Sequence, residues 1–215
     1  MKLEPFDWNI VIVGRWNTAI LTPGRIAEKI FEIKPPTGIF VNVPLDGISP
    51  YMVKDPQQEI VIVTEYNRLI IQIVKMDYET VQKGLKAGLK VLEWLPETPL
   101  TAAGFNIRYK TSEPIQELID IFPSQIDSKL GSIGYTQISA RAIIRSIGFG
   151  DGVLNLTIAK DDEDFTLLFN FHRQSNSNDG LKEWMRTPVN KISDTVQSIT
   201  KVLGIKVEDE NNDRS

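Results

Sequence analysis

The chain contains no cysteine and only one histidine, His172, among its 215 residues. Thiol nucleophiles, disulfides, iron–sulfur clusters and zinc sites built from cysteine and histidine therefore lose the residues they depend on. No apolar run approaches the roughly 18 residues of a membrane span, and the charged first residues do not resemble a signal peptide. These absences predict a cytoplasmic protein with no cofactor, no metal site and no membrane-spanning segment.

The net charge is also small, because the chain has 24 Lys and Arg residues and 28 Asp and Glu residues, which gives −4. A general nucleic-acid binder needs a concentrated basic surface that displaces counterions from phosphates, so we do not expect a nucleic-acid partner. The hydrophobic fraction of 41% is typical of a folded protein with a real core. Only residues 207–215, which are acidic and lack apolar periodicity, are expected to form a disordered tail.

The first half of the chain alternates strand and helix patterns. Residues 8–13 form a β-branched run typical of a buried strand, and residues 59–64 and 69–74 flank a short polar turn as in a β-hairpin. Thr22-Pro23 predicts the start of one helix, and Asp77 predicts the N-cap of a second that ends at Leu95-Pro96. Glycine costs about 1 kcal/mol inside a helix, so Gly84 and Gly88 suggest that the second helix lies close to a sheet.

The second half repeats this order of elements. We predict a helix over residues 114–121, then strands over 137–146, 153–159 and 165–172. In residues 137–146 the even positions Ile138, Ala140, Ala142 and Ile144 are apolar and the odd positions are largely polar, which predicts that these even positions face the core. Thr187-Pro188 begins a final helix that ends at Gly204, with an apolar stripe formed by Met185, Val189, Ile192, Val196, Ile199 and Leu203.

This order of elements predicts an α+β fold made of two related lobes of antiparallel sheet packed against long helices, with the lobes either sharing one sheet or packing back to back. The predicted lobes are residues 1–112 and residues 113–206, followed by the acidic tail. Each contains a helix, about three antiparallel strands and a long helix. The halves show no visible sequence identity, so duplication is a hypothesis from element order alone.

Four polar residues form the candidate site. His172 is the only side chain whose ordinary pKa lies near neutrality, and strand alternation places it on the same face as Asn170. Arg141 and Arg145 lie on the polar face of their own strand. If the strands bring these faces together, Arg141, Arg145, Asn170 and His172 form a polar pocket for an anionic ligand. The alternatives are a solvated sheet face and a hydrogen-bonded surface histidine, and we identify no catalytic residue or metal ligand.

Two further motifs have simpler explanations. Residues 161–164 are consecutive acids, but they lack the alternating ligands and central glycine of a calcium loop and are typical of a solvated turn between strands. The glycines at 148, 150 and 152 lie between two predicted strands, whereas a phosphate-binding loop precedes a helix. Both motifs therefore predict hairpin turns.

The segment from Leu95 to Tyr109, LPETPLTAAGFNIRY, resembles a segment found in families of uncharacterised bacterial proteins. The resemblance covers the middle of the chain. It implies a bacterial origin and carries no activity, cofactor or catalytic residue. In physical terms Pro96 and Pro99 end a helix, and Gly104 allows a tight entry into the next strand.

No set of nucleophile, base and electrophile converges in this sequence, so the leading hypothesis is a non-enzymatic module for protein interaction or assembly. Its partner is a second copy of the chain or another protein, since closed homo-oligomers are common among such chains. The alternative is a small-ligand-binding protein or an enzyme that uses the polar pocket around Arg141, Arg145 and His172.

Overall fold

The computed structural model describes residues 2–34, 38–46, 49–112, 116–122, 124–135, 140–161 and 164–207. The predicted acidic tail lies almost entirely outside these residues. The strands are β1 (Lys2–Pro5), β2 (Trp8–Gly14), β3 (Phe40–Asn42), β4 (Met52–Lys54), β5 (Ile60–Thr64), β6 (Arg68–Ile73), β7 (Leu100–Thr111), β8 (Ala140–Phe149), β9 (Gly152–Asp161), β10 (Asp164–Gln174) and β11 (Lys206–Val207). The helices are α1 (Pro23–Lys29), α2 (Tyr78–Trp94), α3 (Gln116–Ile119), α4 (Gln125–Ser132), α5 (Asn178–Met185) and α6 (Val189–Val202).

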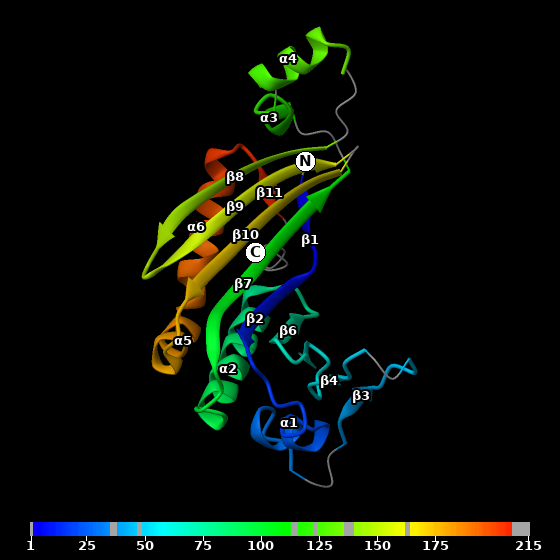
Figure 1. The fold of residues 1–215 in the computed structure, drawn as a ribbon, viewed down its shortest axis with the longest axis vertical. Coiled ribbons are helices and arrows are strands. Elements are labelled where there is room, and N and C mark those ends of the chain that lie inside the picture. Colours follow the sequence, from blue (N-terminus) through cyan, green and yellow to red (C-terminus); the bar gives the residue numbers. More distant parts are fainter. Residues whose placement is uncertain are drawn as a thin grey trace, which may run out of the picture.

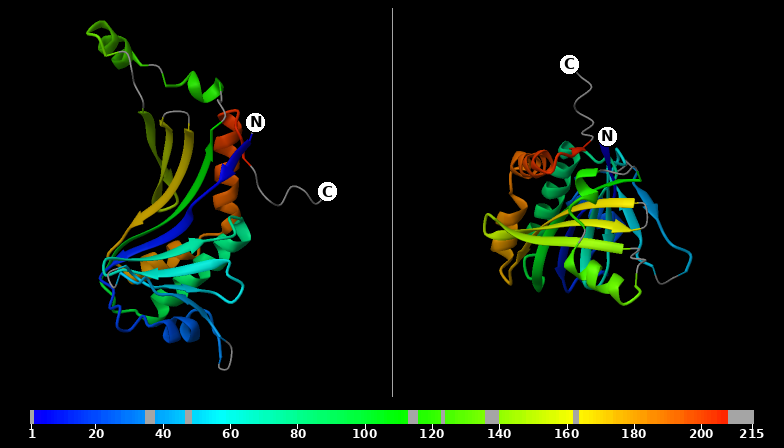
Figure 2. Two further views of the ribbon diagram at one scale, coloured as in Figure 1. Left: turned by 90° about the vertical axis from the view of Figure 1, so that its right-hand side faces the viewer. Right: turned by 90° about the horizontal axis from the view of Figure 1, so that it is seen from above.

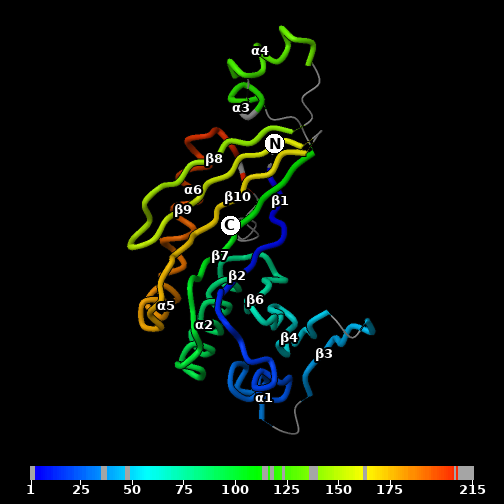
Figure 3. The backbone as a smooth tube through the Cα atoms, in the orientation of Figure 1, coloured from blue at the N-terminus to red at the C-terminus, as the bar shows by residue number. Residues whose placement is uncertain are grey.

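One antiparallel sheet runs through both halves of the chain in the order β3-β4-β5-β6-β2-β7-β10-β9-β8 (Figure 1). The predicted α+β class is therefore confirmed. The boundary predicted at residue 112 falls directly after β7, and the sheet continues across it because β7 pairs with both β2 and β10. Figure 3 shows β7 and β10 side by side although they are far apart in the sequence.

The strand order is similar on the two sides of the central β2–β7 pair. On one side the four strands β6, β5, β4 and β3 follow β2, and on the other side the three strands β10, β9 and β8 follow β7. In each half a helical segment comes between the central strand and the meander, and one or two helices follow the meander. Near its other end β7 pairs with β1, which in turn pairs in parallel with β11. The two halves therefore share one sheet and do not form separate sheets.

Helices α2, α5 and α6 cover one face of the sheet, as the two views of Figure 2 show. Asp77 is the N-cap of α2, and its side chain accepts a hydrogen bond from the Thr80 amide, as predicted. A Cβ atom added to Gly84 would lie 2.8 Å from the terminal methyl groups of Ile10 and Ile73. The helix backbone therefore lies against the sheet at this point, which confirms the interpretation of the glycine.

An aromatic cluster fills the space between α5 and the sheet. The ring of Phe171 lies 5.1 Å from that of Phe105 and 4.8 Å from that of Phe149, and Trp184 of α5 stacks on Phe105 at 5.5 Å. The predicted buried face of residues 165–171 is confirmed, because all its apolar members are buried: Phe165, Leu167, Phe169 and Phe171. Such offset and edge-to-face pairs stabilise a core beyond their area alone.

Several predicted boundaries differ from the structure. The final helix begins at Thr187-Pro188 as predicted, since Pro188 is the N-cap of α6. Met185, the first residue of the predicted stripe, belongs instead to the separate short helix α5. Proline has no amide hydrogen to continue the helical bonding of α5 into α6. Pro114 and Ile115 of the helix predicted over 114–121, and residues 136–139 before β8, lie outside the described residues. None of the helices in the described ranges is long and apolar enough to cross a membrane.

Candidate functional site

Strand register separates the four residues of the predicted polar pocket. Directly paired residues of antiparallel strands share a face, and Arg145 pairs with Leu156, which pairs with Phe169. Asn170 therefore lies on the opposite face from Arg145. The same reasoning places His172 with Asn170, and Arg141 with Arg145. Arg141 and Arg145 thus lie on one face of the sheet, and the other two residues lie on the opposite face. The four side chains do not converge on one pocket.

The orientation of β8 explains this correction. A two-residue turn, Gly150-Asp151, closes the β8–β9 hairpin at the Phe149–Gly152 pair, and Gly150 adopts a φ of +58° that suits glycine. This turn fixes the register and sends the odd positions of β8 toward the helix-covered face. The even positions Ala140, Ala142 and Ile144 are exposed instead. The prediction that they face the core is therefore wrong.

Each predicted site residue has its own surroundings. The Nε atom of Arg141 donates to the Asp127 carboxylate of α4 at 3.1 Å, and Nη1 of Arg145 donates to the Ile144 carbonyl at 2.9 Å. His172 pairs in register with Gly104 on one side and with Val153 on the other. Its neighbours in the sheet are thus a residue without a side chain and an apolar residue, neither of which can act as a catalytic partner.

A row of four asparagine amides and one serine hydroxyl crosses the uncovered face of the sheet, and we call it the amide ladder. It comprises Ser146, Asn155, Asn170, Asn106 and Asn9 on five adjacent strands, β8, β9, β10, β7 and β2. These residues are directly paired in register. Side-chain hydrogen bonds run along the whole row, with donor–acceptor distances of 2.7, 3.2, 2.7 and 2.8 Å.

The amide ladder continues into an ion pair at the bend between β1 and β2. Asn9 donates to the backbone carbonyl and the carboxylate of Asp7, each at 3.3 Å. The Asp7 carboxylate forms an ion pair with Arg108 of β7, and Arg108 also donates to the Asp7 carbonyl at 3.1 Å. The ladder thus ties five strands of the sheet together through groups that satisfy one another.

The contacts among the residues of the amide ladder were not predicted from the sequence. Asparagine is depleted in strands, so an asparagine inside an apolar run, such as Asn9, was the available signal. That signal cannot say which asparagines meet. The meeting depends on the order β8-β9-β10-β7-β2 and on the register of each pair.

The outer edge of β8 is the longest free edge of the described sheet. Strand β8 has 10 residues and pairs with β9 on one side, whereas the opposite edge strand, β3, has 3 residues. Exposed apolar side chains gather at β8, with Ile144 61% and Ile147 42% exposed. Long exposed edges offer a row of backbone donors and acceptors to another strand.

Helix α4 lies beyond one end of β8 (Figure 1) and has no buried residue in the protein as described. Ile126 within α4, and Ile133 and Tyr135 just after it, are each at least 66% exposed. Isolated helices of this length are only marginally stable in water. An ion pair between Asp127 of α4 and Arg141 connects α4 to β8. The apolar surface of β8 therefore extends toward α4.

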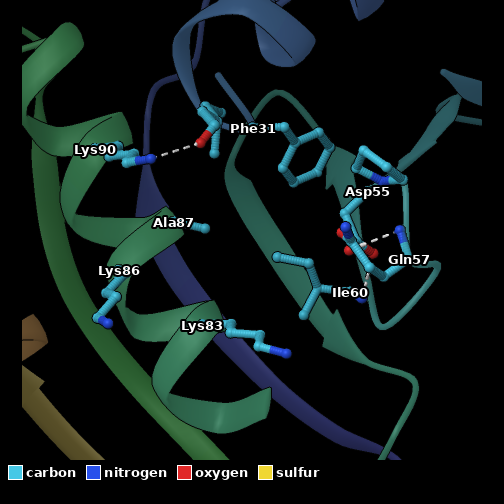
Figure 4. Close-up of a pocket in the computed structure, with 10 residues that line it drawn as sticks. Phe31, Asp55, Gln57, Ile60, Lys83, Lys86, Ala87 and Lys90 are labelled. Carbon is cyan, nitrogen blue, oxygen red and sulfur yellow. Dashed lines mark hydrogen bonds between the residues drawn. The ribbon is translucent and has the colours of Figure 1, made fainter. Parts of the chain in front are cut away.

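A small cavity of about 200 Å³ lies between the end of α1, α2 and the loop before β5 (Figure 4). Two of its three lining lysines have partners: Lys83 donates to Glu59 at 2.6 Å, and Lys90 donates to the Ile30 carbonyl at 3.1 Å and pairs with Glu32 at 2.9 Å. The hydrogen bond to Glu59 raises the pKa of Lys83. The cavity is smaller than the roughly 300–1,000 Å³ of typical ligand pockets.

Within the described ranges, no group of three or more His, Asp or Glu residues is placed to hold a metal ion. Asp161 and Asp164 form the closing pair of the β9–β10 hairpin, as predicted for this acidic turn, and the two acids between them lie outside the described residues. No family model matches the chain, and no curated protein sequence matches it. The geometry of the chain itself is therefore what a functional proposal has to rest on.

Proposed function

We propose that this protein is a non-enzymatic assembly module that binds an extended polypeptide strand along the free edge of β8. The proposal includes a cytoplasmic location, with which the cysteine-free composition agrees. The observation that carries it is the long β8 edge, which has no partner strand among the described residues. Strand addition at such an edge gains main-chain hydrogen bonds and draws specificity from alternate side chains.

The hydrogen-bonding groups of this edge can be assigned. In a two-residue turn the amide that follows the turn donates to the carbonyl that precedes it. The Gly152 amide therefore donates to the Phe149 carbonyl, and this closing pair is a hydrogen-bonded pair. Hydrogen-bonded pairs then alternate along the ladder, which directs the backbone groups of the odd residues toward β9. The amides and carbonyls of the even residues point away from β9: Ala140, Ala142, Ile144, Ser146 and Gly148.

The edge also lacks the features that usually protect edge strands. It contains no proline and no lysine, and four of its five outward-bonding residues are small. Its charges, Arg141 and Arg145, lie on the helix-covered face, and Arg145 donates to the outward Ile144 carbonyl at 2.9 Å. An incoming strand therefore displaces no bulky or charged side chain from the uncovered face, but it replaces this one side-chain hydrogen bond with a main-chain one.

The alternative of a small-ligand site loses its main support, because Arg141 and Arg145 lie on the opposite face from Asn170 and His172. The amide ladder is neutral, and its members bond to one another. An acid–base or nucleophilic mechanism needs a proton donor and a proton acceptor, or a nucleophile and its base, within reach of one substrate. Neither the separated residues nor the neutral amide ladder meets this need.

The test uses a proline that blocks the edge without touching the hairpin. The Ala142 amide points outward, so Ala142→Pro removes one outward donor and leaves the bonds to β9 in place. Ala142→Val keeps the donor and serves as the matched control. Decapeptides selected from a displayed library for binding to the wild-type chain are then measured against both variants, after thermal unfolding has verified that both fold.

We expect the selected peptides to bind Ala142→Pro about 5- to 30-fold more weakly than wild type, since one or two lost hydrogen bonds correspond to about 1–2 kcal/mol. Binding to Ala142→Val should stay within about twofold of wild type on the same scale. Selected peptides that bind all three proteins equally would contradict strand addition at β8.

A further inference from the structure

We infer that the strand occupying the β8 edge is β8 of a second copy of the chain, paired antiparallel about a two-fold axis at Ile144. This inference rests on the proposed function and names its partner. A two-fold axis perpendicular to the sheet carries each face onto the same face of the partner, and the resulting interface is self-complementary. Directly opposed residues must therefore share a face, which restricts pairing to even with even and odd with odd positions.

Two of these registers pair the greatest length of β8, and they differ in what meets at the axis. One is centred on Ile144 and pairs Ala140 through Gly148 of each strand. The other is centred on Arg145 and pairs Arg141 through Phe149. Centring on Arg145 places the two Arg145 side chains directly opposite each other, and like charges in that position are destabilising. Centring on Ile144 avoids any direct pairing of arginines.

The side chains that meet in the favoured register suit one another. On the uncovered face Ile144 meets the partner's Ile144, and Ala142 meets the partner's Ser146. The Ile144 side chain, 61% exposed in the single chain, then gains an apolar neighbour. On the helix-covered face Arg145 meets the partner's Ile143. The aliphatic part of the arginine side chain can pack on the isoleucine while its charge stays in water.

The backbone permits this register. All the residues whose amides and carbonyls point outward are even, so both registers pair outward-bonding residues with one another, and the side chains decide between them. The two sheets then continue as one through the dimer. The edge at β3 cannot substitute, because only Phe40–Asn42 form that strand. A β3–β8 contact would also be heterologous and would extend without closing.

The test exploits the absence of cysteine, since every disulfide that forms must involve an introduced residue. Hydrogen-bonded antiparallel pairs have Cα atoms about 5.5 Å apart, within the range of about 4.4–6.8 Å that a disulfide spans. Three single variants are oxidised in parallel: Ile144→Cys for the favoured register, Arg145→Cys for the competing register and Val41→Cys for the β3 edge. Val202→Cys, at an 87% exposed position of α6, measures random collision.

We expect the full chain to have the mass of a dimer in light scattering and Ala142→Pro that of a monomer. Ile144→Cys should cross-link at least about tenfold faster than the other three variants, because only this position faces its own symmetry mate at disulfide distance. Faster cross-linking through Arg145→Cys or Val41→Cys would overturn the inferred register or edge.

A monomeric wild-type chain whose peptide binding is lost in Ala142→Pro would overturn the second copy as partner while the assembly function stands. A monomeric chain whose peptide binding is insensitive to Ala142→Pro would overturn both. Folding is checked by thermal unfolding of each variant, and the slow cross-linking of folded Val202→Cys provides the baseline for every comparison.

Discussion

The two faces of the sheet are stabilised in different ways, although the same strands supply both. Under the helices, β10 contributes buried apolar side chains, and its aromatic rings contact those of Phe105, Tyr109, Phe122 and Phe149. On the uncovered face the same strand contributes Asn170, which bonds to Asn106 and Asn155. One face is held by close packing of apolar groups and the other by directional hydrogen bonds.

This contrast teaches how the sheet can leave one face without helices. Apolar side chains gain stability when they leave water, so the covered face needs the helices above it. An amide ladder instead bonds across strands and can stand at a half-exposed surface, as Asn155 and Asn170 do. We therefore expect changes on the covered face to cost more than changes on the ladder, and the following variants test this ranking.

The largest effect is expected from Phe171→Ala at the centre of the covered face. The side chain is fully buried between Phe105 and Phe149, so truncation leaves a cavity and should lower the free energy of unfolding by about 3–5 kcal/mol. Denaturant unfolding followed by circular dichroism measures the change. Phe171→Leu, which keeps most of the volume, is the control and should lose less; a loss below about 1 kcal/mol for Phe171→Ala would mean that this face is not the main source of stability.

An intermediate effect is expected from Asn106→Ala in the middle of the amide ladder. The change leaves the Nδ2 donor of Asn170 and the Oδ1 acceptor of Asn9 without their partner. We expect a loss of about 1–3 kcal/mol in the free energy of unfolding. Ser146→Ala, at the exposed end of the same ladder, is the matched control and should stay within about 0.5 kcal/mol of wild type. Equal losses for the two variants would show that the ladder does not gain strength toward its centre.

The smallest effect is expected at the start of α2, the helix that covers the sheet. Burial opposes ionisation of Asp77, but hydrogen bonds from Lys75 and from the Thr80 amide outweigh it and lower the pKa of the carboxyl. Loss of an N-cap costs about 1 kcal/mol, so Asp77→Ala should lower the free energy of unfolding by about that amount at pH 7. Urea unfolding at a series of pH values measures it.

The pH dependence of this contribution has a definite sign. A carboxyl whose pKa is lower in the folded than in the unfolded state stabilises the fold above the unfolded pKa of about 3.9. The stabilisation is lost as the pH falls from there through the folded pKa. Asp77→Asn keeps the cap without the charge and should show a smaller decline of stability in acid. An identical decline in both proteins would exclude Asp77 as its source.

Local patterns predicted much of the fold. The hairpin of β5 and β6, the cap and the close-packed glycine of α2, and the aromatic face of β10 all appear where the sequence placed them. Each depends on residues that are neighbours in the chain, through a short turn, a helical spacing or strict alternation. Met185 was wrongly assigned to the stripe of the final helix, because its spacing to the next apolar residues is helical although it precedes Pro188.

The candidate site was less predictable, because it depends on which strands meet. Alternation correctly placed Asn170 and His172 on one face of β10. The face of β8 was predicted from its composition, whereas the two-residue turn at Gly150-Asp151 set its register and reversed the expected orientation. A shift of one residue exchanges all the side chains between the two faces of a strand. The predicted pocket failed for this reason alone.

The sequence by itself determined the chemistry that this chain can offer and the identity of most of its elements. Its missing cysteines, its single histidine and its local apolar periods are all properties that folding does not alter. Only the tertiary structure decided that β2 and β7 join the halves in one sheet, that asparagines from β2, β7 and the distant β9–β10 hairpin meet, and that β8 is left at the edge. These features are contacts between segments far apart in the chain, and no local pattern records which backbone groups will find a partner.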